Sequence, residues 1–354
     1  MSLRRLLFVV AIVPLCVALP TPLAAAASLH KQNQSWVFDD TSGASNTVTV
    51  NIDGATGELV ITSVESFVYS DSSCTVTAGL PNSIRCPLAS AFFLDVNLGD
   101  GDDVGSSLIA SRAGAPIVVW NGGQGNDRIT GGGNRDIFGS PEGDGADTYI
   151  GGGGIDTVNY TNRLGAVVTR LDGAPGSGAL GENDTVGADI ENVFGTDFGD
   201  VVTGNAGDND LEGDGNLITG DGGDTLKGEG GDDALRGYKG DDKLDGGAGD
   251  DLLYGDEGND TAHGGPGNDM FHGMTGDDQL FGDSGADVLN GEGGNDTLVG
   301  GPGKDRFVAG SGNDVIQAKD KVKGEKIDCG PGRDTVVADK GDKPAKNCER
   351  VKFA

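Results

Sequence analysis

Ten nonapeptides follow one another without an insertion between Gly228 and Gln317, from GEGGDDALR at the start to AGSGNDVIQ at the end. In every unit the fourth residue is Gly, the sixth is Asp and the eighth is apolar. A fixed short period restricts the chain to a repeat architecture, because each unit packs mainly against its neighbours. The sixth-position residues are Asp233, Asp242, Asp251, Asp260, Asp269, Asp278, Asp287, Asp296, Asp305 and Asp314.

Each recurring residue type has a physical role in the unit. Gly adopts positive φ without steric cost, so Gly at positions one and four allows the first six residues to form a tight turn. An Asp in that turn presents a hard oxygen close to several backbone carbonyls, and oxygen-only coordination is what Ca²⁺ prefers. The last three residues place one apolar side chain between two outward ones, which is a short strand buried on one side.

A disordered tract rich in Gly and Asp is the alternative interpretation, since low hydrophobicity with high net charge is typical of disorder. Composition alone does not explain agreement at three positions of every unit in one register. The pattern therefore favours a folded, ion-binding repeat of turn and strand.

The unit resembles the RTX (repeats-in-toxin) calcium-binding nonapeptide G-G-x-G-x-D-x-U-x. The resemblance covers residues 99–354 and is strongest over 228–317. It implies an all-β fold, a parallel β-roll or β-solenoid in which two nonapeptides make one coil. It also implies multiple calcium ions as cofactors, each lying between turns that stack on the same edge of the roll.

A second, shorter block of repeats covers Gly122–Asn159. Its units GGQGNDRIT and GGGGIDTVN match the repeat fully, so Asp127 and Asp156 join the ten aspartates of the main block as candidate calcium ligands. Two degenerate units between them offer Asp136 and Asp147 with weaker matches.

The formal net charge of the chain is −31. This charge excludes nucleic acid as a natural partner, because binding to phosphates requires neutralisation by Lys and Arg. It suits cations, since clustered carboxylates without counterions repel one another and open the compact state. Calcium ions are the predicted partners.

Residues 1–27 have the features of a secretory signal peptide. Arg4 and Arg5 precede the apolar run Leu6–Ala18, and small residues lie before Ser28. A membrane anchor is the alternative, but the run is too short and prolines follow and interrupt it. We predict a secreted protein, extracellular or at the cell surface, without a membrane span.

Four cysteines remain after the predicted cleavage, in two local pairs, Cys74 with Cys86 and Cys329 with Cys348. In an exported protein such pairs indicate disulfides. In the entropy model each would stabilise the fold by about 3 kcal/mol. Zinc binding is the weaker alternative, because neither CxxC spacing nor a nearby His supports it.

The order of segments predicts one long solenoid with its own ends. We expect a signal peptide at 1–27, an N-terminal β segment or cap at 28–98, and a first RTX repeat block at 99–159 that opens with a degenerate unit containing Asp103. The segment 160–203 resembles the spacer that many RTX proteins carry between repeat blocks, which implies a spacer solenoid that keeps winding while losing most of its ions. The main RTX β-roll follows at 204–317, with a small disulfide-stapled C-terminal cap at 318–354.

The sequence contains no recognisable catalytic motif. The sequence has three histidines and no HExxH pattern, and His263 and His272 occupy position nine of adjacent units. We expect these two on opposite sheets, too far apart to share a metal. The GDSG string at 282–285 imitates a serine-protease loop, but it fills positions one to four of a nonapeptide without a His/Asp framework. The prediction is that the protein is not an enzyme.

The sequence therefore favours an exported calcium-binding β-roll protein that folds on binding Ca²⁺ and has a structural, adhesive or extracellular-matrix role. A cell-surface or matrix polymer is a further candidate partner, because the tail after Gln317 is basic. The alternative is a secreted hydrolase or polysaccharide-modifying enzyme with active residues on a solenoid face.

Overall fold

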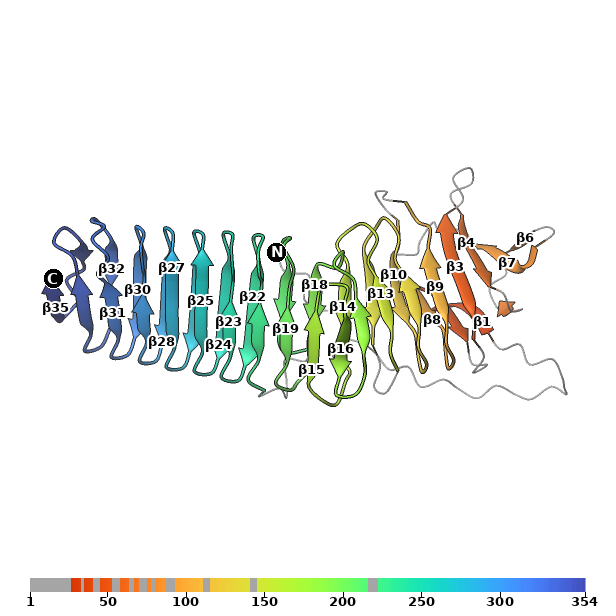
Figure 1. The fold of residues 1–354 in the computed structure, drawn as a ribbon, viewed down its shortest axis with the longest axis horizontal. Coiled ribbons are helices and arrows are strands. Elements are labelled where there is room, and N and C mark those ends of the chain that lie inside the picture. Colours follow the sequence, from red (N-terminus) through yellow and green to blue (C-terminus); the bar gives the residue numbers. More distant parts are fainter. Residues whose placement is uncertain are drawn as a thin grey trace.

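The fold is a two-faced β-solenoid, seen in a computed structural model (Figure 1). The structure describes residues 27–32, 35–40, 45–52, 58–63, 67–69, 75–77, 80–86, 93–110, 115–140, 145–215 and 222–353. The signal peptide predicted at 1–27 lies almost wholly outside the described residues, and so does Cys74. In the part of the chain that is described, no helix has the length and hydrophobicity of a membrane span.

The chain winds so that successive strands of the main roll fall alternately on two faces, each a largely parallel sheet. The first face contains β5 (Phe67–Tyr69), β1 (Ala27–Gln32), β2 (Ser35–Asp40), β8 (Phe93–Asn97), β10 (Ile117–Asn121), β12 (Asp136–Gly139), β14 (Thr157–Asn159), β18 (Asn192–Phe194), β20 (Asp210–Glu212), β22 (Ala234–Lys239), β24 (Leu252–Glu257), β26 (Met270–Thr275), β28 (Val288–Gly293), β30 (Arg306–Ser311), β32 (Lys326–Asp328) and β34 (Lys343–Pro344).

The second face lies opposite the first, with the core between them. It contains β6 (Thr75–Thr77), β7 (Leu80–Cys86), β4 (Leu59–Ser63), β3 (Thr47–Ile52), β9 (Val104–Ser107), β11 (Arg128–Thr130), β13 (Thr148–Ile150), β17 (Asp184–Val186), β16 (Pro175–Ala179), β15 (Val167–Arg170), β19 (Val201–Thr203), β21 (Thr225–Lys227), β23 (Lys243–Asp245), β25 (Thr261–Pro266), β27 (Gln279–Ser284), β29 (Thr297–Val299), β31 (Val315–Ala318), β33 (Thr335–Ala338) and β35 (Arg350–Phe353).

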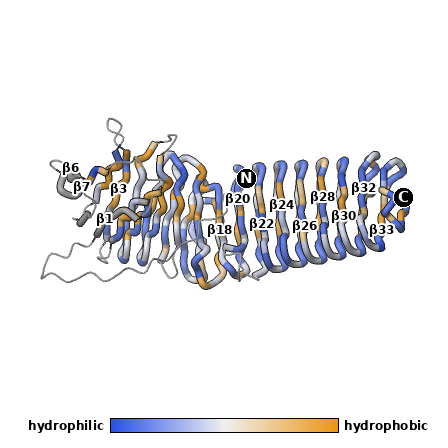
Figure 2. The backbone as a smooth tube through the Cα atoms, turned by 180° about the vertical axis from the view of Figure 1, so that it is seen from behind, coloured by the Kyte–Doolittle hydropathy of each residue, from blue (hydrophilic) through white to orange (hydrophobic). Residues whose placement is uncertain are grey.

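The core is a double column of eighth-position side chains. On the first face Leu253 pairs in register with Leu235 and Phe271, and on the second Leu280 pairs with Ala262 and Leu298. All ten eighth-position residues of the main block are at most 2% exposed. Figure 2 shows the resulting alternation of hydrophobic and hydrophilic stretches along each coil. The predicted all-β parallel roll is confirmed, and in most strands of the main block the eighth-position residue is the one apolar side chain in the core.

The N-terminal part joins the solenoid through parallel pairings of β2 with β8 and of β3 with β9. Beyond them, β3, β4, β7 and β6 pair antiparallel. Cys86 of β7 is disulfide-bonded, while its predicted partner lies outside the described residues.

The spacer departs from simple winding. On the first face β14 pairs directly with β18, as a continuing coil would. On the second face an extra strand, β16, lies antiparallel between β15 and β17. Its sequence PGSGA contains no nonapeptide turn, so the chain reverses there instead of completing a coil.

The C-terminal segment continues both faces. Parallel pairings join β30 to β32 and β34, and β31 to β33 and β35. The predicted disulfide between Cys329 and Cys348 is confirmed, with Cα atoms 5.2 Å apart.

Candidate metal centres

The turns stack closely because the glycines at the contacts between them have no side chain. A Cβ on Gly258, which has a φ of +147°, would lie 1.6 Å from the carbonyl oxygen of Gly240 one coil earlier. This position-four approach recurs along the main block, so the carbonyl oxygens of successive turns form a continuous stack on each edge.

The sixth-position aspartates form two rows, one on each edge of the roll. The first-face row precedes the strands of the first face, and the second-face row precedes those of the second. In both rows the Oδ1 atom of each Asp accepts the backbone N–H of the Asp one coil earlier, at 2.7–3.0 Å. Each aspartate therefore connects two coils through its own side chain.

The second carboxylate oxygen points into the turn. Among the described residues, Oδ2 is buried and accepts no hydrogen bond in Asp156, Asp224, Asp233, Asp242, Asp251, Asp260, Asp269, Asp278, Asp287, Asp296, Asp305 and Asp314. An unpaired buried polar atom is costly, and in a native protein it is typically explained by an ion or a water.

The space around this oxygen is kept open by the first-position glycine. In the nine units of the main block that begin with Gly, Oδ2 lies 2.0–2.5 Å from where a Cβ on that residue would be. Beside Gly228 the same space also faces the carbonyl oxygen of Gly246, 2.3 Å from the Cβ position. Carboxylate and carbonyl oxygens around a space without side chains fit Ca²⁺.

Carboxylates alone do not complete these sites. Across the described ranges, no group of three or more His, Cys, Asp or Glu side chains lies together as a metal-binding cluster. A calcium ion would therefore take its remaining ligands from the stacked backbone carbonyls, which are the donors that the glycines bring together.

The electrostatics of the rows are unfavourable to unneutralised charge. The pKa values of Asp242, Asp260 and Asp278 are raised to about 7, mainly because these side chains are buried. Nearby aspartates raise the pKa further, whereas the hydrogen bond from the neighbouring coil lowers it. One coil before Asp242, the pKa of Asp224 is raised to about 9, mainly by burial. A bound divalent cation would stabilise the ionised form of these groups.

The ion-free roll should lose stability as the pH rises. The folded state binds protons at these aspartates with pKa values of about 7, against 3.8 in the unfolded chain. Because the folded state holds more protons, these aspartates stabilise it fully below pH 3.8. That stabilisation is lost as the pH rises through about 7. In chelator the chain should therefore show more β-sheet circular dichroism at pH 5 than at about pH 8, and a higher Tm where a melting transition remains.

Calcium should reverse this dependence, because the ion binds only ionised carboxylates. The matched measurement is the same pair of melts in saturating calcium. An ion-free chain whose Tm rises between acidic and alkaline pH would contradict the arrangement of buried, mutually repelling carboxylates.

All twelve aspartates predicted as ligands lie in the two rows. Asp127 accepts the N–H of Asp103 and donates its own to Asp147 Oδ1, both at 2.8 Å. Asp156 accepts the N–H of Asp136 at 2.8 Å and donates its own to Glu191. Metal binding by these residues stays a prediction, but the structure assembles them as that prediction requires.

The rows also contain carboxylates outside the predicted ligand set. They include Asp103, Asp136, Asp147, Asp184, Glu191, Asp200, Asp224, Glu325, Asp334, Asp342 and Glu349. Several precede a residue and then a buried apolar one, as in Asp184-Thr-Val and Asp200-Val-Val. This pattern of an acid, any residue and an apolar residue remains where glycines of the nonapeptide are replaced. It would have identified these carboxylates from the sequence.

The first-face row is interrupted at the start of the main roll. Asn209 takes the place of an Asp: its N–H donates to Asp233 Oδ1 at 2.7 Å, and its own Oδ1 accepts the N–H of Asn205. Its Nδ2 atom donates to the carbonyl oxygen of Glu191 one coil earlier at 3.2 Å, so the side chain still connects two coils while removing one negative charge.

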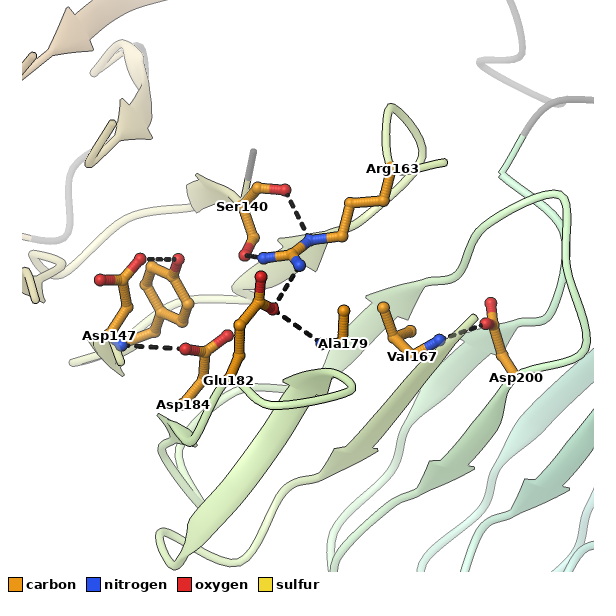
Figure 3. Close-up of polar contacts among 9 residues, drawn as sticks. Ser140, Asp147, Arg163, Val167, Ala179, Glu182, Asp184 and Asp200 are labelled. Carbon is orange, nitrogen blue, oxygen red and sulfur yellow. Dashed lines mark hydrogen bonds and ion pairs between the residues drawn. The ribbon is translucent and has the colours of Figure 1, made fainter. Parts of the chain in front are cut away.

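The second-face row is interrupted in the spacer (Figure 3). Asp147 is linked to Asp184, whereas Asp200 instead accepts the N–H of Val167. Near this interruption the buried Arg163 donates to the carbonyl and hydroxyl oxygens of Ser140 and pairs with Glu182. Here a protein cation, held by oxygen acceptors, neutralises an acid of the spacer.

The two position-nine histidines lie on opposite faces, as expected from the winding. His263 on β25 contacts Asp283 at 3.0 Å and stacks on Phe281. His272 on β26 contacts Glu292 at 2.9 Å and stacks on Tyr254. Each ring is engaged by its own sheet, so the pair does not form a shared site.

Comparison with known proteins identifies the repeat. The sequence model of the RTX calcium-binding nonapeptide repeat matches residues 121–139, 143–158, 218–253, 254–289 and 281–316. No curated protein matches the chain.

Proposed function

From the premise that this chain carries RTX calcium-binding nonapeptide repeats and is a calcium-binding β-roll protein, we propose that it is exported and folds on binding calcium. The two rows of buried carboxylates support this most directly, because along each row a buried carboxylate oxygen without a hydrogen-bond partner recurs from coil to coil. Metal-binding free energy becomes folding free energy where the site does not exist in the unfolded chain.

The proposed export rests on the predicted signal peptide and on the disulfide between Cys329 and Cys348, which is typical of oxidising compartments. Calcium modules outside the cell typically bind at about 10⁻⁴–10⁻³ M. The roll would stay open where calcium is scarce and close where it is plentiful.

We further propose a structural, adhesive or matrix role for the protein. The division of the chain into the segments given above also remains a proposal. The long, regular solenoid supports this role, since repeat stacks present extended surfaces. A cell-surface or matrix polymer is the proposed partner, with the basic tail as one contact. That the protein is not an enzyme stays a prediction.

The enzyme alternative has no supporting observation. A hollow beside the spacer is lined by Ile155, Ala188, Glu191, Asn192, Asn205, Ala206, Gly207, Asp208, Asn209 and Asp210. This lining supplies acids and amides but not the converging Arg and Tyr that would favour sugar chemistry. Arg163, which lies in the spacer, is buried and held by Ser140 and Glu182.

The test is selective calcium binding followed by calcium-dependent capture. In calorimetric titration the chain should bind several Ca²⁺ ions and respond weakly to Mg²⁺, because Mg²⁺ requires a tighter octahedral site. The purified chain should then bind to whole cells or matrix in calcium and be released by chelator. Equal binding of Mg²⁺ would argue against the calcium sites, and capture unaffected by chelator would argue against the adhesive role.

A further inference from the structure

The turn Cys329–Asp334 belongs to the segment that the sequence assigns to the cap, and it lies beyond the family match, which ends at residue 316. Its sequence CGPGRD nevertheless keeps Gly at positions two and four and Asp at position six. The preceding turn on the same edge, Ala309–Asp314, is the last of the main block. The two turns can therefore be compared atom by atom.

Their backbone contacts are the same. Asp314 donates its N–H to Asp334 Oδ1 at 3.0 Å, as Asp296 does to Asp314 at 2.9 Å. Thr335 donates to the carbonyl oxygen of Asp314 at 2.8 Å, and Gly312 donates to that of Pro331 at 3.0 Å. The equivalent bonds one coil earlier measure 2.8 and 2.9 Å.

The carbonyl stack also continues into this turn. A Cβ on Gly332 would lie 1.5 Å from the carbonyl oxygen of Gly312. One coil earlier, a Cβ on Gly312 would lie 1.5 Å from the carbonyl oxygen of Gly294. The backbone oxygens between the turns are thus presented in the same way on both sides of the Ala309–Asp314 turn.

Asp334 supplies the orphaned oxygen. The residue is 0% exposed, and within the described residues its Oδ2 atom accepts no hydrogen bond. Cys329 takes the first position, where most turns have Gly. A side chain at this position has a precedent, because Ala309 opens the preceding turn, whose Asp314 also has a buried Oδ2 atom that accepts no hydrogen bond from the described residues.

The disulfide holds the end of the same row. Cys329 opens the turn and is bonded to Cys348, and the next residue, Glu349, accepts the N–H of Asp334 at 3.0 Å. The carboxylate that completes the second-face row is therefore tethered to the turn that it completes.

We propose that Asp314 and Asp334, with the carbonyl oxygens of their turns, bind a further calcium ion outside the recognised repeats. The ion and the Cys329–Cys348 disulfide then secure the same turn, so calcium protects the disulfide from reduction. This inference rests on the proposed calcium binding of the roll.

The test compares the wild-type chain with Asp334→Asn, which keeps the Oδ1 acceptor for Asp314 but removes the charged free oxygen. Native mass spectrometry should show fewer bound ions in this variant than in the wild type. In calcium, its Cys329–Cys348 bond should be reduced by dithiothreitol at least about tenfold faster, since calcium at 100 times its dissociation constant favours the ion-bound turn about 100-fold. Asp334→Glu, which keeps a carboxylate, should retain most of the protection.

Two matched substitutions separate the possible failures. Asp245→Asn changes the same charge on an exposed residue of the main roll, far along the chain from the disulfide, and should leave ion count and reduction rate unchanged. Asp296→Asn removes a ligand of the main roll and should lower the ion count. If Asp296→Asn lowers the count and Asp334→Asn changes neither measurement, the proposed site is wrong while the calcium roll stands. If neither variant lowers the count, the proposed function fails with it.

Discussion

Removal of calcium by a chelator at neutral pH should abolish most of the β-sheet circular dichroism of the chain, and added calcium should restore it. Without ions, buried aspartates such as Asp260 and Asp278 face like charges in adjacent coils. Neighbouring strands of a sheet lie about 4.8 Å apart, so the repulsion recurs at every coil.

The size of the effect follows from mass action. Calcium at 100 times its dissociation constant stabilises the folded state by about 2.7 kcal/mol for each site. Five such sites contribute about 14 kcal/mol, which is comparable to the whole stability of an ordinary domain, about 5–15 kcal/mol. A thin core of one side chain per strand does not replace that contribution.

Circular dichroism during a calcium titration is the measurement, with Mg²⁺ as the control ion. The chelator itself should be matched for ionic strength, since added salt also screens the carboxylates. A chain that is already β-rich in excess chelator and unchanged by calcium would refute ion-driven folding.

Substitution of Gly258 by Ala should be among the most damaging single changes in the main roll. The new methyl group would lie 1.6 Å from the carbonyl oxygen of Gly240, and the φ of +147° disfavours any side chain. Overpacking costs about 1–3 kcal/mol and an unfavourable left-handed backbone about 1–2 kcal/mol more. We expect a loss of about 3 kcal/mol in saturating calcium, seen as a Tm lower by about 4 °C in a chain of this length.

Gly293→Ala is the matched control. Gly293 occupies position three of its unit, its φ lies outside the left-handed region, and a Cβ there would meet its nearest atom at 3.5 Å. The unit containing Ala248 already has Ala at this position. Similar Tm values for the two variants would show that the carbonyl stack tolerates a displaced turn and does not limit stability.

The regular part of this fold could be predicted from sequence because its determinants are local. Gly at position four, Asp at position six and an apolar residue at position eight each specify one feature of a coil, and ten copies leave one consistent register. The positions of Asp242 and Leu244 follow directly from that register.

The irregular parts depend on contacts that no local pattern encodes. The reversal at β16 is held by contacts such as that between Arg163 and Glu182, which lie 19 residues apart. Asp200 joins its row although Phe198 stands where the repeat has its fourth-position Gly. Asp334 lies in the segment predicted as a cap, which the sequence marks by its basic composition and its cysteines. In each case the backbone hydrogen bond between coils, and not the motif, defines the position.

Those hydrogen bonds also give the solenoid a direction. Along both rows the N–H donor belongs to the earlier coil and the carboxylate acceptor to the later one. A cut at the amino end therefore leaves a carboxylate that water can solvate. A cut at the carboxyl end leaves a backbone N–H that has lost its carboxylate acceptor, so water or a replacement acid must accept it. In the second-face row Glu349 fills this role for Asp334, and a roll shortened from its carboxyl end would need an equivalent acceptor at its new last coil to keep this bond.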